Sequence, residues 1–233
     1  MPDSASMSMN RFRLLLFDLD GTLVDSVGDL AWCGDEMQRR LGLPARGREA
    51  TLNWVGNGME RLVKRLLTGT MDGEPDEVLF GRGLEIFREL YGRHASDHCE
   101  VYPGVLVCLD WFRSRDYRLA CVTNKPEPFT SQLLEAMGLL DYFDLVVAGD
   151  TTARKKPDPM PLNYAADHFD LGHDTCLMVG DSSNDVLAAK AAGFASAGVT
   201  YGYNHGRDIA ESSPDFVFDN LSELANLFNR ETT

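Results

Sequence analysis

The clearest pattern along this chain is an alternation of short apolar runs with longer segments of mixed polarity. Residues 14–17 form the first run, and similar runs recur between residues 105 and 199, each after a segment with apolar residues at helical spacing. Short apolar runs bounded by turn residues are typical of strands buried on both faces. We therefore predict an α/β fold with a Rossmann-like, doubly wound parallel sheet.

The predicted elements after residue 100 follow this alternation. Strands are expected at 119–122, 145–148, 176–179, 195–199 and 216–218, and helices at 105–113, 129–137, 161–169, 186–192 and 222–228. Residues 27–98 differ, because their apolar residues recur at helical spacing, with breaks at 42–44 and 68–75. We therefore predict a core domain of residues 11–23 and 101–228, with a helical domain of residues 24–100 inserted after the first strand.

Two carboxylates stand where the first apolar run ends. Asp18 and Asp20 are separated by one residue and followed by a Gly-Thr turn. Residues i and i+2 of a strand point to the same side, so both acids can face one ligand. Their repulsion is relieved if a hard cation such as Mg²⁺ binds there, or if one acid works protonated and the other ionised. The alternative is an ordinary aspartate-capped turn.

Other chemically active side chains follow two later strands. Thr123 and Asn124 come directly after the strand at 119–122, and Asp181 and Asp185 follow the strand at 176–179. A proline-rich loop that contains Lys155 and Lys156 lies between them. In open α/β sheets, ligands bind outside the carboxyl ends of the strands. The sequence therefore predicts one site at this edge, although each residue also has a structural alternative as a helix cap, a strand residue or a solvated loop cation.

These four segments, in this order, resemble the motifs of haloacid dehalogenase-type phosphatases. The resemblance covers about residues 11–210 and implies that residues 24–100 form a small helical cap over the site. Within that superfamily the segments at 17–26, 121–126 and 200–206 are similar to those of the phosphoglycolate phosphatase family. The first two segments recur in many relatives, so only the third favours 2-phosphoglycolate as the substrate.

The resemblance also implies a role for each motif residue. Asp18 would be the nucleophile that forms an aspartyl-phosphate, and Asp20 the general acid and base. Thr123 and the backbone amide of Asn124 would hold the phosphoryl oxygens. Lys156, placed directly before a proline as in the family, would be the fixed cation that offsets the charge of Asp18.

The same resemblance implies Mg²⁺ as the cofactor. Asp18 and Asp181 would bind the ion through their carboxylates and Asp20 through its backbone carbonyl, which leaves the Asp20 side chain free. We expect Asp185 to orient Lys156 or metal-bound water, with direct ligation as the alternative. Catalysis of phosphoryl transfer comes mainly from positioning and electrostatic stabilisation, which such a set of residues supplies.

Several residues of the helical segment are candidates for substrate or metal binding. Asn57 and Gly58 belong either to a loop over the site or to a turn that begins a helix, and the two interpretations have equal weight. Three cations share one predicted helix face and are more typical of a solvated surface than of a carboxylate site: Arg61, Lys64 and Arg65. His94, His98 and Cys99 have helical spacing, but a metal site there is disfavoured because no second pair of ligands is nearby.

Composition limits the partners and the compartment. The chain has 22 basic and 36 acidic residues and a net charge of −14, which disfavours nucleic acid and anionic membranes. Its five cysteines have no CxxC spacing, and the early apolar run is too short for a secretory signal. We expect a reduced, cytoplasmic enzyme, a monomer or a homodimer, without a membrane span.

The predicted activity is Mg²⁺-dependent hydrolysis of a small phosphate monoester, 2-phosphoglycolate first. Another metabolite such as a sugar phosphate is the main alternative, and a phosphosugar mutase is a further one. A dehalogenase is disfavoured because removal of a halide needs no acid at Asp20. A non-catalytic binding module stays open because a fold does not determine function, although the intact acids disfavour it.

Overall fold

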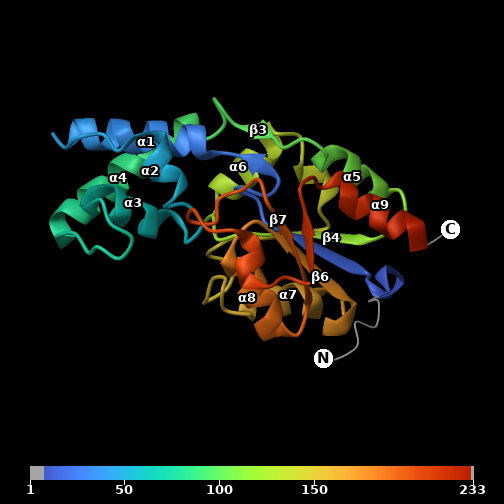
Figure 1. Ribbon diagram of the computed structural model, residues 1–233. Coiled ribbons are helices and arrows are strands. Elements are labelled where there is room, and N and C mark those ends of the chain that lie inside the picture. Colours follow the sequence, from blue (N-terminus) through green and yellow to red (C-terminus); the bar gives the residue numbers. More distant parts are fainter. Residues whose placement is uncertain (1–7, 232–233) are drawn as a thin grey trace.

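The computed structural model describes residues 8–231, and a six-stranded parallel sheet lies at its centre (Figure 1). The strand order is β5-β4-β1-β6-β7-β8. The strands are β1 (Leu14–Phe17), β4 (Arg118–Val122), β5 (Leu145–Val147), β6 (Cys176–Gly180), β7 (Ala195–Val199) and β8 (Phe216–Phe218). In the ladders of the central strand, Phe17 is aligned with Cys121 of β4 and Val179 of β6. The segments that follow these three strands therefore leave the sheet at the same edge.

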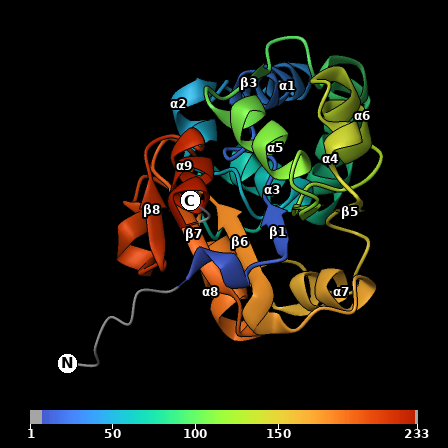
Figure 2. The same ribbon diagram turned by 90° about the vertical axis from the view of Figure 1, so that its right-hand side faces the viewer.

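Helices cover both faces of this sheet, as the doubly wound prediction requires. Leu14 and Leu16 of β1 pack with α7 (Met160–His168) and α8 (Ser183–Ala192). Leu15 and Phe17 point to the other face, where α5 (Val105–Arg113), α6 (Phe129–Ala136) and α9 (Ser222–Glu231) lie. Alternate residues of a strand face opposite sides, so β1 supplies both cores. Figure 2 shows α7 and α8 on one side of the sheet and α5 and α9 on the other.

Four helices form a separate group at one end of the molecule (Figure 1). They are α1 (Val27–Arg40), α2 (Gly47–Leu52), α3 (Met59–Thr68) and α4 (Glu77–His94). Their apolar faces make a hydrophobic cluster distinct from the two that cover the sheet. The ends of this helical segment are joined by β2 (Val24–Asp25) and β3 (Glu100–Val101), which pair antiparallel. The helical insertion is as predicted, and its assignment as a domain of residues 24–100 stays a prediction.

The remaining elements are short, and most bounds differ little from those predicted. The 3₁₀-helices are η1 (Met9–Arg11), η2 (Leu140–Tyr142), η3 (His173–Thr175) and η4 (Ile209–Ser212). Helix α2 was not predicted, because only Thr51 of its six residues is buried and no apolar periodicity marks it. Within residues 8–231, no helix has the length and apolar composition needed to cross a membrane.

Candidate active site

The predicted site residues meet at the carboxyl edge of the sheet. Asp18 follows β1, Thr123 follows β4 and Asp181 follows β6. Because these three strands are neighbours in a parallel sheet and in register, the residues after them are brought together. The loop before α3 approaches the same edge from the helical segment, since the Gly56 carbonyl accepts hydrogen bonds from the Asn124 side chain at 2.9 Å and the Asn184 side chain at 3.2 Å.

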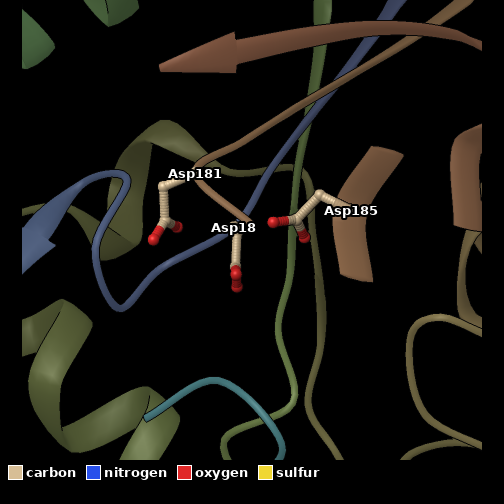
Figure 3. Close-up of side chains that lie close together, drawn as sticks. All are labelled: Asp18, Asp181 and Asp185. Atoms are coloured by element: carbon tan, nitrogen blue, oxygen red, sulfur yellow. The ribbon is translucent and has the colours of Figure 1, made fainter. Parts of the chain in front are cut away.

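Three of the predicted acids form one compact, buried cluster. One carboxylate oxygen from each of Asp18, Asp181 and Asp185 lies within 4.8 Å of the others. Figure 3 shows the carboxyl groups of Asp181 and Asp185 on either side of Asp18. Carboxylate oxygens at this spacing are the ligands that a hard divalent cation takes. The cluster is therefore compatible with a bound metal ion.

Burial and mutual repulsion disfavour ionisation of two acids of this cluster, Asp18 and Asp181. Burial raises the pKa of Asp18 from 3.8 to about 7, with the Asp185 carboxylate adding to the rise and Lys156 opposing it. Burial also raises the pKa of Asp181 well above its ordinary value, and the Asp18 and Asp185 carboxylates add to this effect. Like charges and desolvation both disfavour ionised carboxylates, and a cation reverses both effects. The residues present therefore fit a divalent metal ion.

Lys156 lies at the base of the cluster and is 3% exposed. Its ammonium group donates to the Val122 carbonyl at 2.6 Å and to Asp185 Oδ1 at 2.7 Å, and it lies 3.0 Å from Asp18 Oδ1. Burial alone would lower the pKa of Lys156, but the two carboxylates outweigh burial and raise it. The side chain is thus a fixed cation beside Asp18, at the position expected for it.

Asp185 reaches Lys156 because of how α8 begins. Its Oδ2 accepts from the Ser182 backbone N–H at 3.1 Å and from the Ser182 hydroxyl at 2.8 Å. A side chain at the third helical position that binds back to the cap is a common way to start a helix. Since Oδ1 binds Lys156 and Oδ2 binds Ser182, the contacts agree with the expected orienting role of Asp185.

Asp20 has different partners from the acid cluster. Its Oδ1 accepts from the Ser26 hydroxyl at 2.5 Å and from Lys125 Nζ at 2.9 Å. Ser26 and Lys125 were not assigned a role from the sequence. The only sequence signal for a role of Lys125 is its position directly after Asn124. Nothing in the sequence indicates that its side chain reaches Asp20. The two carboxylates of the first motif thus stand in separate electrostatic environments, and a metal contact from the Asp20 backbone stays a prediction.

Asp181 is held by groups from two distant loops. Thr22 donates its hydroxyl to Oδ1 at 2.7 Å, and the backbone N–H of Tyr203 donates to Oδ2 at 2.6 Å. Gly21 has φ +89°, and a Cβ there would collide with the Asp181 carboxylate. The turn after Asp20 therefore needs glycine for two reasons: the backbone conformation and the close approach of Asp181.

Tyr203 also fastens the start of the helical segment to the core. Its hydroxyl accepts from the backbone N–H groups of Ser26 at 2.8 Å and Val27 at 3.1 Å, and it donates to the Asp25 carboxylate. The side chain is 3% exposed. The loop at 200–206 thus contacts both the metal-ligand candidate Asp181 and the strand that leads into α1. Nothing in the sequence indicated this contact.

Thr123 and Asn124 line the cavity beside the two motif aspartates. The Thr123 hydroxyl accepts from the Lys125 backbone N–H at 3.2 Å, which leaves its own proton available to a ligand. The Asn124 side-chain amide donates to the Gly56 and Lys156 carbonyls, both at 2.9 Å. Asn124 thus joins the lysine loop to the helical segment, and the substrate contacts expected of Thr123 and Asn124 stay predictions.

Both interpretations of the Asn57-Gly58 turn have support in the structure. Gly58 has φ +84° and immediately precedes α3, so the turn begins a helix. It also lines the cavity beside Asp18. The Asn57 amide donates to the Asn184 side chain at 3.3 Å, which brings it close to the first turn of α8. The predicted contact of Asn57 and Gly58 with substrate is not tested by these contacts.

The other candidates of the helical segment have structural partners. Arg61 and Lys64 both bind Glu74, at 2.7 and 2.6 Å, while Arg65 is buried and donates to backbone carbonyls. His98 and Cys99 both contact the buried carboxylate of Asp29, and His94 contacts Asp97. The acid cluster of Figure 3 is the group that meets the spacing of a metal site within residues 8–231, and the His94 group does not.

Comparison with known proteins shows which family this chain belongs to. Residues 15–199 match the model of the family described as haloacid dehalogenase-like hydrolase. A protein of Nitrosococcus oceani named phosphoglycolate phosphatase is 50% identical over 218 residues, which cover 94% of this chain and 97% of that protein. Phosphoglycolate phosphatase 1 of Pseudomonas aeruginosa is 47% identical over 216 residues, which cover 91% of this chain and 78% of that protein.

A solved structure shows the same architecture. The crystal structure of a protein from Haemophilus somnus, described as a predicted phosphoglycolate phosphatase, superimposes with a TM-score of 0.89 at 35% identity. The alignment covers 93% of this chain and 98% of that one. Because so little of the chain lies outside the alignment, the likeness extends over most of the helical segment as well as the sheet.

Proposed function

Because this chain belongs to the haloacid dehalogenase-like hydrolase family, we propose that it is a phosphatase that hydrolyses 2-phosphoglycolate to glycolate and phosphate. The observation that carries the proposal is the separation of two carboxylates at one cavity. Asp18 lies with the acid cluster and Lys156, while Asp20 lies with Ser26 and Lys125. One acid is thus placed for attack on phosphorus and the other for proton transfer.

The proposed substrate is supported by the relatives. Proteins named phosphoglycolate phosphatase from Nitrosococcus oceani, Thiobacillus denitrificans and Nitrosospira multiformis are 43–50% identical to this chain. Each alignment covers more than nine-tenths of both proteins. Agreement over this length, helical segment included, favours the same substrate, because the part of the substrate beyond the phosphate would meet the helices.

In the first step Asp18 attacks the phosphorus atom. The contacts of the described residues engage Asp18 Oδ1, which accepts from the Leu19 N–H at 2.8 Å and lies 3.0 Å from Lys156 Nζ. Oδ2 is therefore the oxygen available as nucleophile. A bond forms from this oxygen to phosphorus while the bond from phosphorus to the ester oxygen breaks, and Asp20 gives its proton to the departing glycolate oxygen.

In the second step water hydrolyses the aspartyl-phosphate. Asp20, now ionised, takes a proton from the attacking water, the oxygen–phosphorus bond to Asp18 breaks, and phosphate leaves. Thr123 and the Asn124 backbone amide hold phosphoryl oxygens, and Lys156 balances their charge. Asp18 and Asp181 would hold Mg²⁺, with the Asp20 carbonyl as a further ligand and Asp185 orienting Lys156. Bound there, the ion would neutralise charge on the transferring phosphoryl group.

The helical segment completes the proposed site as a cap. Residues of α1, α3 and α4 line the cavity opposite the strand ends. Closure of such a cap excludes water and reads the leaving group, while Asn57 and Gly58 border the phosphate side. We therefore propose residues 24–100 as the cap domain and residues 11–23 and 101–228 as the core.

We further propose a cytoplasmic enzyme that acts on a small soluble ester, as a monomer or homodimer. The support for the compartment is the state of the cysteines. All five cysteines are free thiols, and four of them are buried. Thiols in this state are typical of a reducing compartment.

The test is release of inorganic phosphate from a panel of esters. The panel contains 2-phosphoglycolate, several sugar phosphates, nucleotides and an aryl phosphate, each assayed with Mg²⁺ and with EDTA. We expect Mg²⁺-dependent hydrolysis with a clear preference for 2-phosphoglycolate and no turnover by Asp18→Asn. A preference for another ester would refute the substrate, and recovery of an isomerised phosphosugar without phosphate release would identify a mutase instead.

A further inference from the structure

A small cavity lies between Asp20 and the helical segment. Its volume is about 40 Å³, far below the roughly 300–1,000 Å³ of pockets that take drug-sized ligands. On the side away from the phosphate site the lining is largely apolar and comes from Leu30, Val55, Met59 and Leu62. The cavity therefore suits only a very small leaving group, and most of its wall offers that group no hydrogen bond.

Lys125 is the exception in this wall. Among the lining side chains in the described part of the chain, it alone carries a positive charge. Its Nζ donates to Asp20 Oδ1 and Oδ2 at 2.9 and 3.1 Å and to the Tyr91 hydroxyl at 2.5 Å. The cavity thus contains an ammonium group that is positioned from two sides, by Asp20 and by Tyr91.

Apart from Lys155, the other cations near the site already have partners of their own. Lys156 is surrounded by the Val122 carbonyl, Asp18 and Asp185. On α3, Arg61 and Lys64 bind Glu74 at the surface. Lys155 stands at the rim near Gly58 and is partly exposed. An anionic group inside the cavity would therefore meet Lys125 first.

Resting on the proposed function, we propose that Lys125 binds the carboxylate of the leaving group and so makes the site selective for phosphate esters of very small hydroxy acids. The ester oxygen must lie within hydrogen-bond reach of Asp20, and Lys125 Nζ is 2.9 Å from Asp20 Oδ1. In glycolate the carboxyl carbon is two covalent bonds from that oxygen. The distances therefore allow one substrate to contact both residues at once.

The chemistry of lysine permits this double contact. An ammonium group has three donors on a flexible stem, so it can keep Asp20 oriented while one donor turns to the substrate. Leaving groups without an acid would place an uncharged end against Lys125, which would then keep only its contacts with Asp20 and Tyr91. The apolar wall would not compensate for this loss, because it has no acceptor to offer. Discrimination then comes from the charge-assisted hydrogen bond to Lys125 that only the correct ester makes.

The test compares two esters in three proteins. The esters are 2-phosphoglycolate and ethyl phosphate, which lacks the carboxylate, and the proteins are wild type, Lys125→Met and the matched rim variant Lys155→Met. We expect the ratio of kcat/KM for 2-phosphoglycolate over ethyl phosphate to fall at least about 30-fold in Lys125→Met, the loss expected when one partner of a buried charge pair is removed. In Lys155→Met we expect it to change less than about 3-fold, as for an exposed charge.

Each outcome decides between the alternatives. An equal loss on both esters would show that Lys125 only positions Asp20, and a larger change of ratio in Lys155→Met would move the carboxylate to the rim; both overturn the proposal. If wild type prefers an ester other than 2-phosphoglycolate, the proposed function fails. If wild type hydrolyses 2-phosphoglycolate but the ratio does not move, only the role of Lys125 fails.

A second measurement needs no variant and covers the case in which Lys125→Met does not fold. Glycolate and ethylene glycol have similar size, but only glycolate carries a carboxylate. We expect glycolate to inhibit wild-type turnover of ethyl phosphate with a Ki at least about 30-fold lower than that of ethylene glycol. Equal inhibition by the two would overturn the proposal.

Discussion

Replacing Asp18 with asparagine should stabilise the metal-free protein near neutral pH even though it abolishes turnover. Asp18 is 9% exposed, and burial with the nearby Asp185 carboxylate raises its pKa from 3.8 to about 7. The ionised carboxylate is therefore unfavourable in the folded state without a metal ion. Asparagine carries no charge, and its Oδ1 can accept the same contacts from the Leu19 N–H and Lys156.

The magnitude follows from the pKa. A rise from 3.8 to about 7 corresponds to about 4 kcal/mol between the two protonation states. Because the pKa of Asp18 is higher in the folded than in the unfolded state, its stabilising contribution is fully present below about pH 3.8 and is lost as the pH rises through about 7. Relaxation and entry of water reduce the cost of the buried charge, so we expect Asp18→Asn to be more stable by about 2–4 kcal/mol near pH 8.

The assay is urea unfolding of wild type and Asp18→Asn in EDTA, near pH 5 and near pH 8. We expect the advantage of the variant to grow with pH and to shrink when Mg²⁺ is added, because the ion binds the ionised cluster of the wild type better. Asp167→Asn, an exposed change on α7, controls for the general effect of removing one negative charge. A variant no more stable than wild type near pH 8 in EDTA would show that the buried Asp18 carboxylate does not destabilise the metal-free protein.

Three further changes test the contacts around the cluster. Asp20→Asn should slow hydrolysis by about 10²–10⁴-fold and let the phosphoenzyme persist, as measured by rapid quench, and a wild-type rate would remove the acid–base assignment. Lys156→Met leaves the Asp18 and Asp185 carboxylates without their cation and should cost about 3–5 kcal/mol of unfolding free energy in urea, whereas Lys190→Met at the surface should cost almost nothing. Tyr203→Phe should lower the free energy of unfolding by about 1–3 kcal/mol in thermal unfolding, because two backbone N–H groups lose their acceptor. The control Tyr201→Phe should cost less, because that hydroxyl has one contact, to the Thr22 carbonyl. Equal effects would contradict the role of Tyr203 in fastening the helical segment to the core.

The chemistry at the strand ends was readable from the sequence because it depends on local order. Three apolar runs in the sequence are each followed by a reactive side chain: Asp18, Thr123 and Asp181. These runs therefore show which side chains stand at the ends of the strands. Parallel pairing then requires that they leave at one edge, and the registers of β1 with β4 and β6 agree. The boundary between strand β6 and helix α8 was predictable for the same reason. Helix α8 nevertheless begins three residues earlier than expected, at Ser183, because Ser182 caps it with a hydrogen bond to Asp185.

The helical segment was less predictable. Its apolar spacing indicates helices, but α2 has almost no buried residues and therefore no periodic signal. The order of the four helices around their own hydrophobic cluster is set by packing between residues far apart in the sequence. Whether Asn57 and Gly58 border the site depends on that packing, so the sequence left two interpretations open.

The sequence pattern is enough to specify the fold class, the strand ends that carry reactive side chains, and the acids, hydroxyl and lysine that meet there. The partners of those groups depend on the folded structure: Lys125 contacts Asp20, and Tyr203 contacts both Asp181 and the start of α1. The physical reason is that strand ends are aligned by regular backbone hydrogen bonds, which a periodic pattern encodes. Side chains from separate loops meet instead through burial and complementary charge, and these depend on the complete packed structure.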